Sequence, residues 1–220
     1  MDLIVDTSYE QLKVILSDNG ISFCNQEKNG KHLQNLLPEI DRIMTQANKS
    51  INQIDNFCVV LGPGSFTGVR IGVSTVKAFL MALPNKKVIG INKFELITHS
   101  IFTKLQIKSK VAIVIKSTAT KYYFALVSST GIIEKMNLLN AENIIKEIKN
   151  ENAMLFSLND EFNYHDIKSA TIVLTNEDYI NFVKLKKNNN AYMPLQELKP
   201  IYLALSQAEE ELLKRQAKND

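Results

Sequence analysis

The order of apolar segments starts twice along this chain, and this repetition constrains its fold more than any other feature. Three short apolar runs joined by tight turns open the chain: residues 3–5, 12–16 and 21–24. Three more open its second half: residues 111–115, 122–127 and 132–138. Short apolar runs bounded by turn-forming residues are typical of strands. One supersecondary plan that restarts after about half of the chain indicates a duplicated fold.

Helices and strands alternate in the rest of the first half. Residues 31–47 carry apolar side chains at every third or fourth position, which is typical of an amphipathic helix. Residues 57–61 form a continuous apolar run, as expected of a buried parallel strand. A helix, a strand and a further helix are then predicted at residues 69–83, 87–91 and 94–105. Three hairpin-linked strands followed by crossover units are the order expected of an RNase H-like lobe.

The second half repeats this order in a shorter form. A helix is predicted at residues 141–148, and two strands are predicted at 153–158 and 171–174. Another helix opens at Thr175, which has Asp178 three residues later in a capping-box pattern. The predicted fold is therefore α/β, with duplicated RNase H-like lobes in an actin-like ATPase architecture and a reduced second lobe. We expect lobes at residues 1–106 and 107–199, with a terminal helix at 200–216 that packs back on the first lobe.

The composition is that of an ordinary folded protein. Hydrophobic residues make up 45% of the 220 residues and charged residues 22%. The net charge of +3 is too small to indicate a nucleic-acid binder. Cys24 and Cys58 lie in apolar runs and are predicted to be buried thiols. No apolar stretch approaches the roughly 20 residues that cross a bilayer, and the chain opens with an acid at Asp2, so we expect a cytoplasmic protein without membrane contact.

A glycine-rich loop at residues 62–68 separates the strand at 57–61 from the next helix. A Walker phosphate loop needs a Lys after its last glycine, but none follows Gly68, and Pro63 supplies no amide. A helix N-terminus can still attract an anion. Nucleotide binding around this loop and the first strand end is therefore kept as a weaker hypothesis, with these candidate residues: Asp6, Thr7, Ser8, Gly62, Gly64 and Ser65.

The helix after this loop carries small residues. Gly72 lies in its interior, where glycine costs about 0.5–1 kcal/mol relative to Ala, so its presence indicates a geometric demand. Ser74, Ala78 and Ala82 form a ridge of small side chains that would let another helix approach closely. The demand on Gly72 can come either from its own sheet or from another molecule, and the pattern leaves both interpretations open.

Residues 62–72, which read GPGSFTGVRIG, resemble the signature of the TsaB (YeaZ) family. Residues 4–8 resemble the first strand of that family, residues 31–38 its first helix, and residues 200–209 its C-terminal tail. The resemblance is strong to about residue 100 and weak from there to about 198. The second lobe departs from the family pattern, because Lys116 replaces a carboxylate and Thr118 replaces an Arg.

The resemblance implies a non-catalytic partner of TsaD, the subunit that transfers a threonylcarbamoyl group to the adenosine 3′ of the anticodon in tRNAs reading A-starting codons. The helices at about 31–47 and 68–83 would dock onto TsaD, or alternatively onto a second copy of this chain. A TsaE-type ATPase would join the pair, tRNA would be contacted only indirectly, and no cofactor is implied. The implied partner-facing residues are His32, Leu33, Leu36, Leu37, Ile40, Phe66, Val69, Gly72, Val73, Val76 and Leu80.

The rival function is that of a nucleotide-binding ATPase or a small-molecule kinase. Kinases of this architecture need carboxylates from both lobes to hold Mg²⁺ and to act as base. Only Asp6 stands at a strand end, and capping a turn is an equally ordinary role for it. The three histidines, His32, His99 and His165, are widely separated, so no metal site is predicted. No catalytic residue is predicted either.

Overall fold

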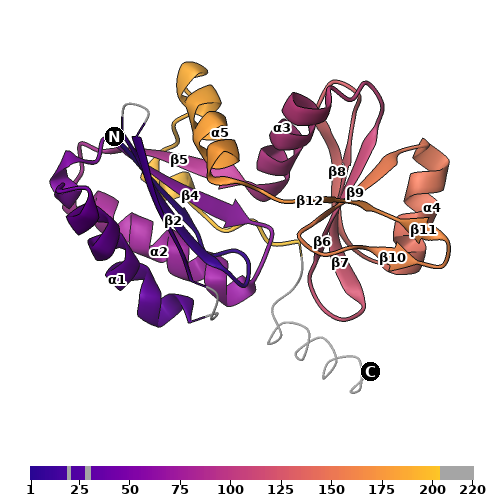
Figure 1. The fold of residues 1–220 in the computed structure, drawn as a ribbon, viewed down its shortest axis with the longest axis horizontal. Coiled ribbons are helices and arrows are strands. Elements are labelled where there is room, and N and C mark those ends of the chain that lie inside the picture. The colour runs from indigo at the N-terminus through magenta and orange to yellow at the C-terminus, as the bar shows by residue number, and fades with distance from the viewer. Residues whose placement is uncertain (19–20, 28–30, 204–220) are drawn as a thin grey trace.

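The computed structural model describes residues 1–18, 21–27 and 31–203, and its chain forms two five-stranded mixed sheets that lie side by side (Figure 1). The first sheet and its helices comprise β1 (Asp2–Asp6), β2 (Leu12–Asp18), β3 (Ile21–Glu27), α1 (His32–Gln46), η1 (Ile51–Gln53), β4 (Asn56–Gly62), α2 (Phe66–Ala82), β5 (Lys87–Asn92) and α3 (Lys93–Leu105). The remaining elements are β6 (Val111–Lys116), β7 (Lys121–Val127), β8 (Ile133–Asn140), α4 (Ala141–Glu151), β9 (Met154–Leu158), β10 (Asn163–Tyr164), β11 (Ile167–Lys168), β12 (Ala170–Ile172), α5 (Asn176–Asn188) and η2 (Leu195–Glu197).

The two sheets have the same strand order. The first runs β3-β2-β1-β4-β5 and the second runs β8-β7-β6-β9-β12. The strand directions match too, because β1 is antiparallel to β2 and parallel to β4, while β6 is antiparallel to β7 and parallel to β9. The predicted α/β fold with duplicated RNase H-like lobes in an actin-like arrangement is confirmed.

The second lobe is the smaller copy, as predicted. In the first lobe, α2 makes the crossover between the parallel strands β4 and β5. In the second lobe, the two-residue strands β10 and β11 form a hairpin between β9 and β12, where the first lobe has a helix. Strands of two residues carry too little periodicity to be predicted, and this hairpin was missed.

The predicted helices agree with α1 to α5 except at their ends. The helix expected from residue 69 begins three residues earlier, at Phe66, because the Ser65 Oγ accepts a hydrogen bond from the Gly68 amide at 3.1 Å and caps the first turn. Most of the terminal helix expected at residues 200–216 lies outside the described residues.

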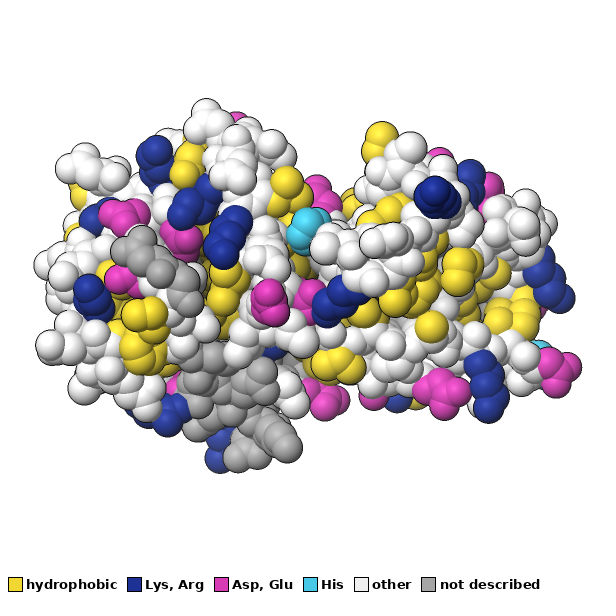
Figure 2. Space-filling model, turned by 45° about the horizontal axis from the view of Figure 1, so that its top comes forward, with side chains coloured by type: hydrophobic (Ala, Val, Ile, Leu, Met, Phe, Trp, Pro, Cys, Tyr) yellow, Lys and Arg dark blue, Asp and Glu magenta, His cyan; other side chains and the backbone are white. Residues whose placement is uncertain are grey.

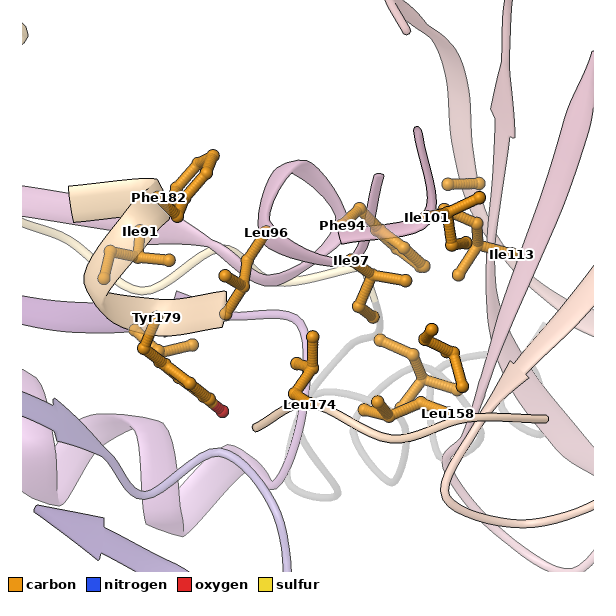
Figure 3. Packing of buried hydrophobic residues seen from close by; sticks show 14 of the residues in the cluster. Ile91, Phe94, Leu96, Ile97, Ile101, Ile113, Leu158, Leu174, Tyr179 and Phe182 are labelled. Carbon is orange, nitrogen blue, oxygen red and sulfur yellow. The ribbon is translucent and has the colours of Figure 1, made fainter. Parts of the chain in front are cut away.

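The buried apolar side chains form three clusters, and one of them joins the two sheets. The outer face of the first sheet packs on α1 and α2, and that of the second sheet packs on α4. A third cluster lies between the sheets, where Phe94 and Ile97 of α3 pack together with Ile113 of β6 and Tyr179 of α5 (Figure 3). Because this cluster contains buried side chains from both sheets, the lobes are held together by burial of apolar surface and not only by their connecting segments.

The chain returns to the first lobe after the second sheet. Asp178 of α5 accepts a hydrogen bond from the Ser100 hydroxyl of α3 at 2.8 Å, and Lys187 pairs with Asp2 at 2.9 Å. Leu198 is buried in the core of the first lobe, and the Ile201 amide donates to the Leu61 carbonyl at 2.7 Å. The lobe boundary predicted at residues 106 and 107 stays a prediction.

The Cys58 thiol is free and buried, as predicted, whereas the side chain of Cys24 lies outside the described part. Among the described helices, none combines the length and the apolar character that a membrane span requires.

Candidate functional site

Asp6, at the end of β1, is held by four hydrogen-bond donors. Its Oδ1 accepts from the Ser8 amide at 2.9 Å and from the Ser8 hydroxyl at 2.6 Å. Its Oδ2 accepts from the Lys93 ammonium at the start of α3 and from the Tyr179 hydroxyl of α5 at 2.5 Å. A carboxylate offers about four lone-pair sites, so these bonds occupy its full accepting capacity.

The environment keeps Asp6 ionised. Burial by itself raises the pKa of this carboxyl, but the Lys93 ammonium and the hydrogen bonds from Lys93, Ser8 and Tyr179 outweigh burial and hold the pKa at about 2. Only 3% of the Asp6 surface is exposed. The buried Lys93 ammonium therefore balances the negative charge of the Asp6 carboxylate, and no metal ion is needed for that purpose.

The glycines of the 62–72 segment allow α2 to lie directly against the end of β1. A Cβ at Gly64 would lie 2.1 Å from the Ser8 carbonyl oxygen, and one at Gly68 would lie 2.0 Å from the Thr7 carbonyl oxygen. A Cβ at Gly72 would lie 2.4 Å from the Thr7 Oγ1. The geometric demand on Gly72 thus comes from its own sheet, and a Gly72→Leu change would disturb the folded chain itself.

A cleft of about 820 Å³ opens between the lobes beside this segment. Its lining residues are Ser8, Tyr9, Glu10, Lys31, His32, Leu33, Gln34, Gly64, Ser65, Phe66, Thr67, Gly68, Ile71, Lys116, Ser117, Thr118, Tyr123 and Asp160. Of the residues expected to bind a nucleotide, Ser8, Gly64 and Ser65 line this cleft. Asp6, Thr7 and Gly62 are buried outside its lining.

Two tyrosines bridge the lobes at this cleft. The Tyr9 hydroxyl donates to the Asp160 carboxylate at 2.6 Å, and the Tyr123 hydroxyl donates to the Gly64 carbonyl at 3.0 Å. Burial and the bond to Asp160 raise the pKa of the Tyr9 phenol. These contacts add directional links between lobes that already share an apolar core.

The structure corrects the set of residues expected to face a partner. Seven of them are buried in the chain's own core or against its own sheet: Leu36, Ile40, Val69, Gly72, Val73, Val76 and Leu80. An amphipathic helix that covers a sheet turns its apolar stripe toward that sheet, so the periodicity identified the inner face. His32 is buried as well, and Phe66 is half-buried.

Exposed apolar side chains lie on the other side of the same two helices. Leu33 and Leu37 of α1 are 78% and 55% exposed, and Met81 of α2 is 74% exposed. Ser74 and Ala78 are also exposed on α2, and their spacing places them on the same helix face as Met81. The two helices run side by side over one face of the first sheet (Figure 1). We call these five residues the α1/α2 face. Sequence reasoning missed Met81, although its place outside the apolar stripe was a usable signal.

The histidines stay apart in the fold. His32 lies at the start of α1, and His99 of α3 contacts Phe182 of α5 with the two rings tilted by 51°. His165, in the β10–β11 turn, meets the Tyr164 ring edge-on. Burial lowers the pKa of His99, and the nearby Asp178 opposes this effect. Within residues 1–18, 21–27 and 31–203, no three His, Cys, Asp or Glu side chains gather in a metal-binding geometry.

Comparison with known proteins identifies relatives of this chain. The family model described as TsaD, tRNA N6-adenosine threonylcarbamoyltransferase, matches residues 19–157, more than half of the chain. The tRNA threonylcarbamoyladenosine biosynthesis protein TsaB of Haemophilus influenzae is 27% identical over 91% of this chain and 92% of its own length. A tRNA N6-adenosine threonylcarbamoyltransferase of Protochlamydia amoebophila is 40% identical over 30% of this chain and 19% of its own length.

A solved structure carries the same fold. YeaZ from Pseudomonas aeruginosa superimposes with a TM-score of 0.71 at 20% identity, covering 92% of this chain and 99% of that one. The family match over residues 19–157, the full-length TsaB relatives and this shared fold lead to one assignment. The chain belongs to the family described by the threonylcarbamoyltransferase model and, within it, to the TsaB (YeaZ) branch of tRNA threonylcarbamoyladenosine biosynthesis proteins.

Proposed function

We propose that this chain is the non-catalytic partner of a TsaD-type threonylcarbamoyltransferase, acting in the formation of N6-threonylcarbamoyladenosine at position 37 of tRNAs that read A-starting codons. The observation that carries the proposal is the environment of Asp6. A catalytic carboxylate must be free to hold a metal ion or to accept a proton. The oxygens of Asp6 are instead taken up by Ser8, Lys93 and Tyr179.

The second lobe offers no acid at the matching position. There β6 ends at Lys116, which is exposed and followed by Ser117 and Thr118. A phosphoryl- or acyl-transfer centre built from both strand ends would therefore lack its paired carboxylates. The missing carboxylate supports a division of roles in which the partner catalyses the transfer. The present chain would supply a surface that docks onto that partner and holds it in a competent shape.

The α1/α2 face is the proposed docking surface. Exposed large apolar side chains such as Leu33, Leu37 and Met81 mark interaction sites, and the small Ser74 and Ala78 allow a partner helix to approach. The local similarity to a threonylcarbamoyltransferase supports a partner with a related lobe. The same face would make a homodimer when that subunit is missing, and a TsaE-type ATPase would join the pair.

Contact with tRNA is proposed to be indirect. The net charge is only +3, and on the face shown in Figure 2 the Lys and Arg side chains are scattered among acidic ones. Binding to nucleic-acid phosphates usually relies on a basic face. The distribution of charge therefore supports recognition of tRNA by the partner.

The proposal is tested by mixing the purified chain with the TsaD-type subunit of the same organism and measuring co-elution and affinity. Leu33→Glu in the first turn of α1 and Met81→Glu in the last turn of α2 place charges at the two ends of the proposed contact, and each should weaken binding by at least about tenfold. Ile132→Glu is the matched control, because Ile132 is 66% exposed but lies just before β8 in the second lobe. All three variants should keep the thermal unfolding midpoint of the parent chain.

Two results would contradict the proposal. One is unchanged co-elution of both α1/α2 variants. The other is formation of threonylcarbamoyladenosine by the isolated chain.

The rival function, an ATPase or small-molecule kinase, draws support from the cleft between the lobes. An ATPase or kinase function requires sustained, Mg²⁺-dependent ATP hydrolysis or phosphoryl transfer by the isolated chain. We expect neither, because Asp6 is committed to Lys93. Steady turnover by the isolated chain would favour the rival.

A further inference from the structure

We infer that the C-terminal segment, residues 204–220, docks on the apolar rim of the cleft between the lobes and competes there with the partner for Leu33. The apolar rim consists of Leu33, Phe66 and Ile71, which line the cleft, together with Tyr202, which stacks on Phe66. The contact does not depend on the docking function proposed above, whereas the competition rests on it.

The last described residues lie beside the apolar rim. The Ile201 amide donates to the Leu61 carbonyl at 2.7 Å, which fixes the chain to the end of β4. The Tyr202 ring stacks on the Phe66 ring with 4.8 Å between their centroids. Leu203 packs against the cluster that joins the two sheets. The segment that follows therefore begins at the cleft and needs no linker to reach it.

The apolar rim presents side chains that the described residues leave exposed. Leu33 is 78% exposed although it lines the cleft, and Tyr202 is 46% exposed although it stacks on Phe66. Phe66 and Ile71 are half-buried. Exposed apolar side chains around a concave site indicate a docking position for another chain segment.

The sequence of the segment supplies a matching apolar face. Leu205, Ala208 and Leu212 are three and four residues apart, which is the spacing of one side of a helix. Helices take most of their stability from packing of such a face and little from intrinsic propensity. A helix rises about 1.5 Å per residue, so Leu205 and Leu212 would lie about 10 Å apart. A cleft of about 820 Å³ has edges on the same scale, so one helix face can cover Leu33 and Phe66 together.

Charged side chains on both sides favour the same placement. The segment carries three consecutive acids at residues 209–211, and Lys31 and Lys116 line the cleft. The lining also holds two acids, of which Asp160 already accepts a hydrogen bond from another lining residue. Exposed ion pairs contribute little each, so charge orients the segment while burial of apolar surface supplies the binding energy.

The covalent connection favours this segment over other occupants of the rim. A segment held close to its site by a short linker has an effective concentration on the order of millimolar there. A second copy of the chain or a separate protein reaches the same occupancy only through a larger contact of its own. The chain's own segment therefore occupies the rim until a partner with a larger interface displaces it.

Leu33 belongs both to the apolar rim and to the α1/α2 face. A docked segment covers Leu33, so a partner that docks on the α1/α2 face has to displace the segment first. The apparent affinity for that partner is reduced by the fraction of chains in which Leu33 is free. Weakening the contact of the segment should therefore strengthen partner binding.

Alkylation of an engineered thiol in the full chain tests the contact. Gln34→Cys places the thiol on an exposed lining residue next to Leu33 and leaves the rim intact. Leu205→Glu puts a charge on the apolar face of the segment and should speed alkylation at position 34 by at least about threefold. Gln207→Glu is the matched control, because the same charge lies on the opposite side of the predicted helix and should leave the rate unchanged.

Ser129→Cys controls for a change in the chain as a whole. It places a thiol in the exposed loop before β8, and neither segment variant should alter its alkylation rate. Peptide mass spectrometry reads each position separately from the native cysteines. Equal rates at position 34 in the parent and in Leu205→Glu would overturn the contact, as would the same acceleration by Gln207→Glu. Protection that is lost on about tenfold dilution would also overturn it, because it would assign the rim to a second copy.

Binding to the TsaD-type subunit tests the competition. Leu205→Glu should tighten the complex by at least about threefold, and Gln207→Glu should leave its affinity unchanged. Unchanged or weaker binding by Leu205→Glu would overturn the competition. Absence of any complex with the parent chain would contradict the proposed function and the competition together, whereas the thiol measurement decides the contact by itself.

Discussion

The ends of β1 and β6 occupy the same place in the two lobes, yet their environments are opposite. β1 ends in the buried Asp6, whose oxygens are bonded to Ser8, Lys93 and Tyr179. β6 ends in the exposed Lys116, and the following turn is closed by the Ser117 amide, which donates to the Lys121 carbonyl at 3.0 Å. Duplication has kept the strand order while the side chains at the strand ends have diverged.

The crossover segments explain this difference. In the first lobe, Gly64 of the loop lies against residue 8 and the glycines of α2 lie against residue 7. The helices α3 and α5 bring a cation and a phenol to Asp6. In the second lobe, a short hairpin stands where the first lobe has a helix, and Lys116 stays in contact with solvent. The comparison teaches that the same sheet can either bury a strand-end charge or present it, depending on the segments that cover that end.

The largest effect that tests this comparison is expected from Lys93→Met. Removing one partner of a buried ion pair leaves an uncompensated charge and typically costs about 3–5 kcal/mol. Lys116→Met at the other strand end should change the free energy of unfolding by less than about 0.5 kcal/mol, since Lys116 is exposed. Urea unfolding of the two variants measures both values.

The double variant Asp6→Asn with Lys93→Met serves as the control for this pair. It removes both charges and should recover part of the lost stability. Equal losses of unfolding free energy for Lys93→Met and Lys116→Met would contradict the distinction between a buried and an exposed strand end.

A smaller effect is expected in acid. The pKa of Asp6 is about 2 in the folded chain against 3.8 for an ordinary Asp, so its contribution is complete above pH 3.8 and is lost as the pH falls through about 2. The contribution is on the order of 2 kcal/mol. The stability difference between the parent chain and the double variant should therefore shrink across this window, as measured by urea unfolding at each pH. A constant difference would mean that Asp6 does not titrate in this range.

The smallest effect is expected from Tyr123→Phe, which removes the hydrogen bond between β7 and the Gly64 carbonyl. One such bond contributes about 0.5–1.5 kcal/mol. The loss should stay small because the apolar core still joins the lobes. Thermal unfolding should keep a single transition. Two separate transitions in this variant would show that the tyrosine bridge, and not the core, couples the lobes.

The periodicity of the chain by itself determined most elements of both lobes and their repetition, with the β10–β11 hairpin as the exception. Side-chain spacing is a local property, so the strands β1, β4 and β6 and the helices α1 to α5 could be located from it. The glycine-rich run at 62–72 was sufficient to indicate the TsaB family for the same reason, because it is contiguous.

Only the tertiary structure decided which groups meet. Lys93 and Tyr179 lie 87 and 173 residues from Asp6, and no local pattern links them to it. Most of the residues expected on the exposed side of α1 and α2 proved to be buried, since a periodic stripe is apolar whether it packs on its own sheet or on a partner. A pattern in sequence specifies which side of an element avoids water, and the packing of the whole chain specifies what covers that side.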